Sequence, residues 1–169
     1  MDFYEDEVVN YATGIRAPPL GDALYHIFLF WHRNDREFSD QLIERLQCAR
    51  NAFKCCSQYD IYKSDGDMTL CQSILSGVKY CSKALLIASW DSLELWRECE
   101  EAINEELDIG RKFVVLQLNP QLDLPTSLSE CNVVSIKDDD WWMKLLDSLA
   151  PVVHLSSTSP SLAGVNPGK

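Results

Sequence analysis

The residues best suited to chemistry in this sequence are Trp96 and Glu100. They are four positions apart, so a helix would place both side chains on one face. Glu100 also follows Cys99, at the border of an apolar stripe, and a carboxylate beside an indole is a group whose environment can be tuned. The surrounding acids are interpreted as a solvated helix face: Glu98, Glu101, Glu105, Glu106 and Asp108.

Other catalytic and metal-binding patterns are missing from the sequence. It has no glycine-rich phosphate loop of the GxGxxG or GxxxxGK[ST] type and no GxSxG nucleophile elbow. None of the three histidines, His26, His32 and His154, stands at metal-ligand spacing from another ligand, and His26 is expected to be a satisfied core or edge residue. We therefore expect no bound metal and no resident cofactor.

Seven cysteines are scattered along the chain without CxxC spacing, which disfavours zinc and thioredoxin-like redox sites. They are Cys48, Cys55, Cys56, Cys71, Cys81, Cys99 and Cys131. The pattern favours a reduced, cytoplasmic protein in which most cysteines act as small buried hydrophobes.

The composition fits one ordinary globular domain with modest tails. The 169 residues are 46% hydrophobic and 24% charged, with a net charge of −11. This acidic balance argues against a nucleic-acid partner and against docking on an anionic membrane. The first nine residues are acidic and lack the apolar region of a signal peptide, and no apolar run approaches the ~18 residues of a membrane span.

Short apolar runs alternate with helical stripes along the chain. The runs predict strands over 25–31, 53–57, 84–88, 113–118 and 133–136. Apolar residues at helical spacing predict helices that include 38–46, 70–78, 96–107 and 142–149. Asn34 or Asp35 should cap the first helix and Gly110 should end the third, while Trp141, beside the core residue Trp142, should be partly exposed.

This alternation predicts a flavodoxin-like three-layer α/β sandwich, with a central parallel sheet of about five strands and helices on both faces. We expect the domain to span residues 24–153, after a loosely ordered leader (1–23) and before a disordered tail (154–169). Such folds place functional groups at the carboxyl ends of their strands. Those ends are Trp31–Asp35, Tyr59–Asp67, Ser89–Leu95 and Asn119–Leu124.

Four segments, in order, resemble the boxes of Toll/interleukin-1 receptor (TIR) domains. Tyr25–Asp35 resembles the opening strand and its polar loop, and Phe53–Val78 the second strand, loop and helix. Ala84–Ala102 resembles the third strand and the Trp-x-x-x-Glu stretch, here Trp96 and Glu100, and Trp141-Trp142 resembles the final aromatic pair. The likeness covers about Leu24 to Leu149 and suggests an animal stand-alone TIR protein.

The resemblance implies a cytoplasmic adaptor or regulator of innate immune signalling that binds other TIR domains, on receptors, adaptors or copies of itself. Open, head-to-tail contacts of this kind grow into filaments. The interaction loop would be Ser64, Asp65, Gly66 and Asp67, and Trp141 is a possible interface residue. A regulatory TIR that binds signalling partners and blocks them is a related possibility.

Some TIR domains resemble NAD⁺ nucleosidases, which gives an enzymatic alternative. The glutamate that matches Glu100 would then be catalytic and would stabilise the oxocarbenium-like centre formed as the nicotinamide–ribose bond breaks. Trp31 or Trp96 would stack on a ring of NAD⁺, and His32 and Arg33 would meet its phosphates. NAD⁺ is then a substrate.

Overall fold

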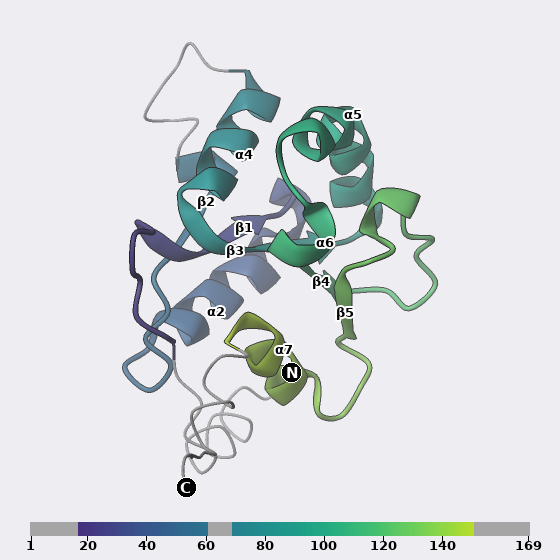
Figure 1. Ribbon diagram of the computed structural model, residues 1–169. Helices are drawn as coiled ribbons and strands as arrows, with labels where there is room; N and C mark the ends of the chain where they lie inside the picture. Colours follow the sequence, from purple (N-terminus) through teal and green to yellow (C-terminus); the bar gives the residue numbers. More distant parts are fainter. Residues whose placement is uncertain (1–16, 61–68, 151–169) are drawn as a thin grey trace, which may run out of the picture.

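The computed structural model describes residues 17–60 and 69–150. Its centre is a five-stranded, all-parallel sheet with the strand order β2-β1-β3-β4-β5 (Figure 1). The strands are β1 (Tyr25–Phe30), β2 (Cys55–Ser57), β3 (Cys81–Ala88), β4 (Phe113–Gln117) and β5 (Asn132–Ser135). The predicted flavodoxin-like α/β architecture is confirmed.

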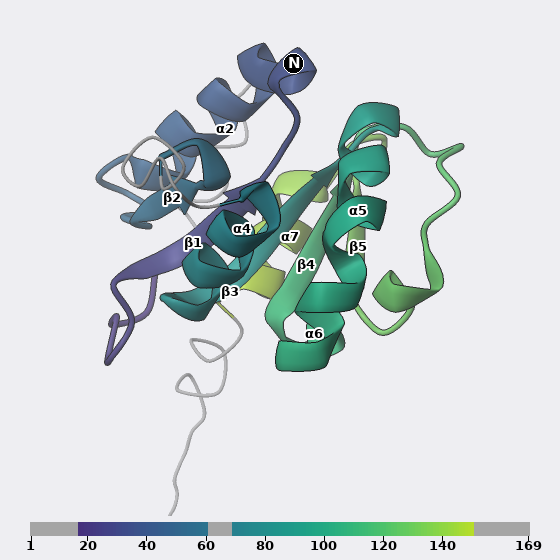
Figure 2. The same cartoon turned by 90° about the horizontal axis from the view of Figure 1, so that it is seen from above.

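Helices cover both faces of this sheet. The helical elements whose bounds fall within the described residues are η1 (Arg33–Asp35), α2 (Arg36–Gln47), α4 (Leu70–Lys79), α5 (Trp90–Glu106), α6 (Ile109–Lys112), η2 (Thr126–Leu128) and α7 (Trp141–Leu149). In Figure 1, α4 and α5 lie above the sheet and α2 and α7 lie below it, and the view from above in Figure 2 shows α4 and α5 side by side. None of the helices in 17–60 and 69–150 is long and apolar enough to cross a bilayer.

The strand sequences explain why two cores form. In β1, Ile27 and Leu29 point to the core beneath α2 and α7, whereas Phe28 and Phe30 point to the core beneath α4 and α5. Because both faces are covered, the strands need apolar residues at successive positions, which is the pattern of a buried parallel sheet. Each such side chain contributes roughly 1.5–3 kcal/mol when it is fully buried.

The third long helix ends earlier than the sequence suggested. We expected Gly110 to terminate it, but α5 ends at Glu106, and Gly110 lies inside the separate short helix α6. A Cβ atom at this position would stand 2.6 Å from Cβ of Glu130. Gly110 is therefore explained by the close approach of a distant segment, and not by a helix end.

Trp141 is also placed differently from the prediction. Its side chain is only 5% exposed and packs against Phe38 and Trp142, with ring centroids 6.4 and 5.8 Å apart. The expected partial exposure is wrong, because α2 covers the ring that a helical projection of α7 alone leaves open. As it stands, this indole offers little surface to a partner.

Part of the predicted leader contacts the domain. The backbone N–H of Ala17 donates to the carbonyl of Asn51 at 2.8 Å. His26 accepts a hydrogen bond from the Lys54 N–H at Nδ1 (2.8 Å), so its Nε2–H donates to the Pro18 carbonyl (2.6 Å). The expectation that His26 is a satisfied core residue is confirmed.

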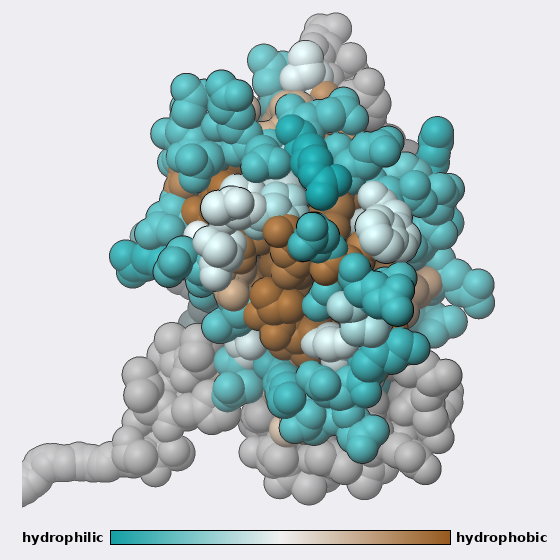
Figure 3. Space-filling model, turned by 90° about the vertical axis from the view of Figure 1, so that its right-hand side faces the viewer, coloured by the Kyte–Doolittle hydropathy of each residue, from teal (hydrophilic) through white to brown (hydrophobic). Residues whose placement is uncertain are grey.

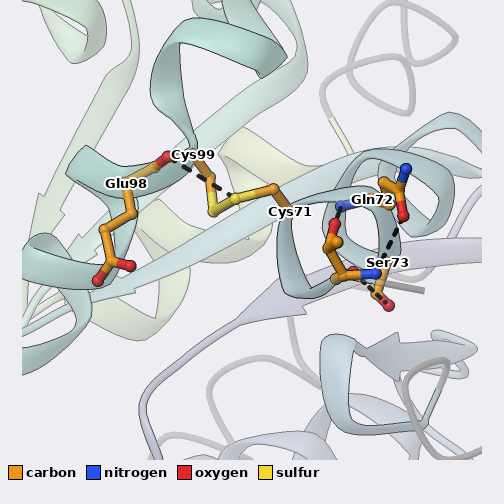
Figure 4. Close-up of a disulfide and its surroundings, with 6 residues drawn as sticks. Cys71, Gln72, Ser73, Glu98 and Cys99 are labelled. Atoms are coloured by element: carbon orange, nitrogen blue, oxygen red, sulfur yellow. Dashed lines mark hydrogen bonds between the residues drawn. A yellow bond between two sulfur atoms is a disulfide. The ribbon is translucent and has the colours of Figure 1, made fainter. Parts of the chain in front are cut away.

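Two cysteines do not follow the expectation of a fully reduced protein. Cys71 in α4 and Cys99 in α5, which are 28 positions apart in sequence, form a disulfide with Cα atoms 5.3 Å apart (Figure 4). The other five cysteines are free thiols. The pairing could not be read from spacing, because it exists only through the packing of α4 beside α5 on one face of the sheet.

The side of the molecule near β5 carries a patch of apolar surface. Figure 3 shows brown, hydrophobic atoms gathered at the centre of this side and surrounded by hydrophilic residues. β5 is the outermost strand of the sheet, and its residue Val133 is exposed. A free strand edge with an exposed apolar side chain is a common place for another chain to bind.

Candidate functional site

The loops that follow β1 and β3 meet at the carboxyl ends of their strands. The Ser89 hydroxyl donates to the Asp35 carboxylate at 2.6 Å, and the Asn34 side-chain amide donates to the Asp91 carboxylate at 2.9 Å. These two bonds join residues more than 50 positions apart. We call the surface formed by residues 32–35 and 89–91 the strand rim.

Asp35 has a role that the sequence did not reveal. It occupies the position before α2, where it was expected to cap that helix, but it makes no capping hydrogen bond. Its carboxylate instead accepts the bond from Ser89. In the same loop, Nδ1 of His32 accepts a hydrogen bond from the Asn34 N–H at 3.0 Å and caps the short helix η1.

The start of α5 is held by two serines. The Ser92 N–H donates to the Ser89 hydroxyl oxygen at 3.2 Å, and the Ser89 N–H donates to the Ser92 hydroxyl oxygen at 2.8 Å, which is a reciprocal capping box. The fully buried Ser92 hydroxyl donates in turn to the carbonyl of Ile87 in β3 at 2.7 Å. The helix start is thus fixed to the strand that precedes it.

Trp90 lies between these fixed residues and is 61% exposed. An exposed indole on a well-bonded helix start offers a large apolar contact at little cost in conformational entropy. Sequence reasoning missed this residue. The available signal was its helical phase, since Trp90 is seven positions before Arg97 and eleven before Glu101, both of which are exposed.

Trp31 and Trp96, predicted to stack on NAD⁺, are both buried and lie on opposite faces of the sheet. The Trp31 ring packs against Tyr59, with centroids 4.6 Å apart, and lies 5.6 Å from the Arg36 guanidinium. Trp96 lies between Phe30 and Phe113 and donates from Nε1 to the Ser127 hydroxyl at 3.0 Å. Each indole is therefore a core residue of its own layer.

Tyr59 packs against Trp31, next to the strand rim. Burial raises the pKa of its phenol, while a backbone hydrogen bond and the positive charge of Arg33, together with Arg36, oppose that shift. The net effect is a raised pKa of the Tyr59 phenol. The preceding residue, Gln58, is buried and donates from its side-chain amide to the Trp31 carbonyl, so the β2 end is tied to the β1 end.

The remaining predicted site residues are only partly brought together. Glu100 is half-buried on α5, and Arg33 is exposed in η1. His32 is half-buried in the loop between β1 and η1. Ser64, Asp65, Gly66 and Asp67 lie outside the described residues. Across 17–60 and 69–150, no hydrogen bond or ion pair engages the Glu100 carboxylate.

A depression of about 330 Å³ lies beside the strand rim at the start of α2. It is lined by Asn34, Asp35, Glu37, Phe38 and Gln41. Its walls carry two carboxylates, which suit a cationic side chain better than a dinucleotide phosphate. Within the described part of the chain, no group of three potential ligands could hold a metal ion.

The comparisons with known proteins agree with this fold. No family model and no curated protein matches the sequence. A crystal structure described as a prokaryotic SEFIR domain superposes with a TM-score of 0.56 and 15% identity, covering 83% of this chain and 99% of that one. This likeness shows that the chain shares the fold of that domain, a parallel five-stranded sheet surrounded by helices.

Proposed function

We propose that this chain is an interaction module that assembles with other TIR-like domains, including further copies of itself, through its strand rim. The observation that carries the proposal is Trp90, a largely exposed indole on a rim whose neighbouring side chains are fixed by hydrogen bonds. Residues of this type dominate the binding energy of protein interfaces. The TIR-like fold supports the same general role.

The setting we propose is the one that the sequence resemblance implies, an adaptor or regulator of innate immune signalling in the cytoplasm. The contact between copies would be open and head-to-tail, so that assembly continues into a filament. Each copy carries a net charge of −11, and like charges repel, so assembly should strengthen as salt screens that repulsion.

The test is a comparison of two exposed aromatic residues at opposite ends of β3. Trp90→Ala removes the indole after the carboxyl end of the strand, and Tyr80→Ala removes a 54% exposed ring before its amino end. We expect Trp90→Ala to weaken self-association, measured by analytical ultracentrifugation at 0.05–0.3 M salt, by roughly tenfold or more. Tyr80→Ala should leave it unchanged, and Trp90→Phe should restore part of it.

Two results would contradict the proposal. One is a chain that stays monomeric at high concentration in every salt condition. The other is equal self-association of the wild type and Trp90→Ala. Since Trp90 is exposed, its replacement should change the free energy of unfolding by no more than about 0.5 kcal/mol, so misfolding would not explain a loss of assembly.

NAD⁺ cleavage is the second candidate function, and it is supported by the half-buried Glu100 carboxylate, which is left without a partner among the described residues. The experiment is to incubate the purified chain with NAD⁺ and measure released nicotinamide. Glu100→Gln is the test variant, and Glu101→Gln, an exposed neighbour on α5, is the matched control. Nicotinamide release that is lost only in Glu100→Gln would establish this activity, and no release by the wild type would remove it.

A further inference from the structure

The disulfide between Cys71 and Cys99 joins two helices that already pack on the same face of the sheet. Cys71 lies in the first turn of α4, and Cys99 lies in the middle of α5 (Figure 4). At the other end of α4, Lys79 forms an exposed ion pair with Glu106 of α5 at 2.6 Å. The covalent link therefore fixes the amino-terminal end of α4, and the ion pair holds the carboxyl-terminal end.

The two cysteines differ in their exposure to solvent. Cys99 is fully buried, whereas Cys71 is half-buried at the edge of the helix pair. A thiolate approaching from solvent would therefore meet Cys71, which keeps part of its surface exposed, before Cys99, which keeps none. Exchange begins only at an accessible sulfur, so this asymmetry fixes the direction in which the bond opens.

The residues around Cys71 and Cys99 can also accommodate the two free thiols that form when the disulfide is reduced. Sγ of Cys71 lies 3.7 Å from the carbonyl oxygen of Glu98, so that its thiol has a hydrogen-bond acceptor once the disulfide opens (Figure 4). The Cys99 thiol would remain a small apolar side chain in the core. The start of α4 keeps its own capping box, in which Thr69 and Gln72 exchange hydrogen bonds, so the helix does not need the disulfide to form.

We propose that Cys71–Cys99 is a reversible thiol–disulfide exchange site, at which a reduced dithiol attacks Cys71 and releases the first turn of α4 from α5. A thiolate of the dithiol forms a bond to Sγ of Cys71, and the Cys71–Cys99 bond breaks. Cys99 leaves as a thiolate and takes up a proton. The second thiol of the dithiol then attacks the first sulfur of the same dithiol, which is bonded to Cys71 in the mixed disulfide. Cys71 leaves as a thiolate and is protonated. The dithiol becomes a disulfide, and the protein gains two electrons and two protons.

A second cysteine pair provides an internal control. The sulfur atoms of Cys56 and Cys81 are 3.6 Å apart, but both side chains are buried, so neither can be reached from solvent. A hydrogen bond from Cys56, together with burial, raises the pKa of Cys81, which keeps it in the unreactive thiol form. Exchange should therefore be confined to the α4–α5 pair, although the Cys56 and Cys81 thiols are also close together.

The experiment uses the full chain, purified without reductant and without denaturant. Dithiothreitol is the probe, and the protein is then alkylated and digested for mass spectrometry. We expect the disulfide peptide to disappear and Cys71 to be labelled under native conditions. Removing dithiothreitol and adding oxidised glutathione should restore the disulfide, with Cys56 and Cys81 unlabelled throughout. Amide hydrogen exchange in the first turn of α4 should rise by roughly tenfold or more on reduction, while α7, on the other face, stays unchanged.

Three outcomes would overturn the inference. They are absence of the disulfide in the unreduced protein, reduction only after denaturant is added, and no change in amide exchange of α4. Cys71→Ser is the supporting variant because it replaces the half-exposed sulfur and leaves the buried one in place. It should reproduce the fast amide exchange without any reductant. The inference concerns the helix pair alone, so it stands or falls separately from the proposed assembly.

Discussion

Replacing Ser92 by alanine tests how firmly the strand rim is held. Its hydroxyl is fully buried, and its two shortest hydrogen bonds are one donated to the Ile87 carbonyl at 2.7 Å and one accepted from the Ser89 N–H at 2.8 Å. Ser92→Ala removes both bonds and leaves the N–H of Ser89 without its partner. The change is small in volume, so no large cavity is expected to add to the effect.

The size of the effect follows from the two bonds. Each hydrogen bond contributes about 1 kcal/mol to stability, and a buried group left unsatisfied costs about 1–3 kcal/mol. Alanine recovers at most about 0.5 kcal/mol, because it is the better helix former. We therefore expect Ser92→Ala to lower the free energy of unfolding by about 2 kcal/mol.

Urea unfolding followed by fluorescence measures this difference. With a urea dependence of about 2 kcal/mol per molar, the midpoint should fall by about 1 M. The matched control is Ser148→Ala on α7, where the hydroxyl donates to the Lys144 carbonyl at 2.9 Å on an exposed surface. The control should stay within about 0.5 kcal/mol of wild type. Equal midpoints for the two variants would refute the reasoning, because the buried hydroxyl would then contribute no more than the exposed one.

Two further predictions follow from the described contacts. Gly110→Ala places a Cβ 2.6 Å from Cβ of Glu130 and should destabilise the protein by about 1–3 kcal/mol, measured by thermal unfolding. An unchanged unfolding midpoint would show that the segment around Glu130 moves away without cost. Burial, with the nearby charges of Asp108 and Glu130, raises the pKa of Cys131 to about 11. Because the thiol pKa is higher in the folded state, the neutral thiol contributes to stability at pH values below its ordinary pKa, and this contribution is lost as pH rises through about 11. The free energy of unfolding should therefore fall above pH 9, and it should fall less in Cys131→Ser. Alkylation of Cys131 that levels off near pH 9 would contradict this shift.

The strands could be predicted well because their evidence is local. Runs such as Phe113–Gln117 are apolar at nearly every position, and that pattern is needed only where a strand is covered on both faces. The helix stripe of Ile74 and Val78 was found for the same reason, since helical spacing shows directly which face meets the core.

The predictions that failed depended on neighbours far away in sequence. Asp35 was expected to cap α2, but its carboxylate instead accepts a hydrogen bond from the hydroxyl of Ser89, which is 54 positions away in sequence. The helical phase of Trp141 could not reveal that α2 lies over it. Gly110 was likewise predicted to end a helix, because the sequence could not show that Glu130 packs against it.

The candidate site, too, could be predicted from the sequence only in part. The sequence predicted that functional groups lie at the carboxyl ends of the strands and singled out Trp96 and Glu100 within the helix that is now α5. Helical phase places Trp96 on the apolar stripe and Trp90 on the exposed face, but the degree of burial of each indole depends on what packs over it, and only the structure shows this.

By itself, the sequence determined the alternation of strands and helices and therefore the layered, parallel architecture, because each element carries its own apolar period. Only the tertiary structure decided which polar groups meet at the rim, which indole is exposed, and that Cys71 is bonded to Cys99. The physical reason is that periodicity records which face of an element is buried, whereas contacts between elements depend on how those faces are stacked.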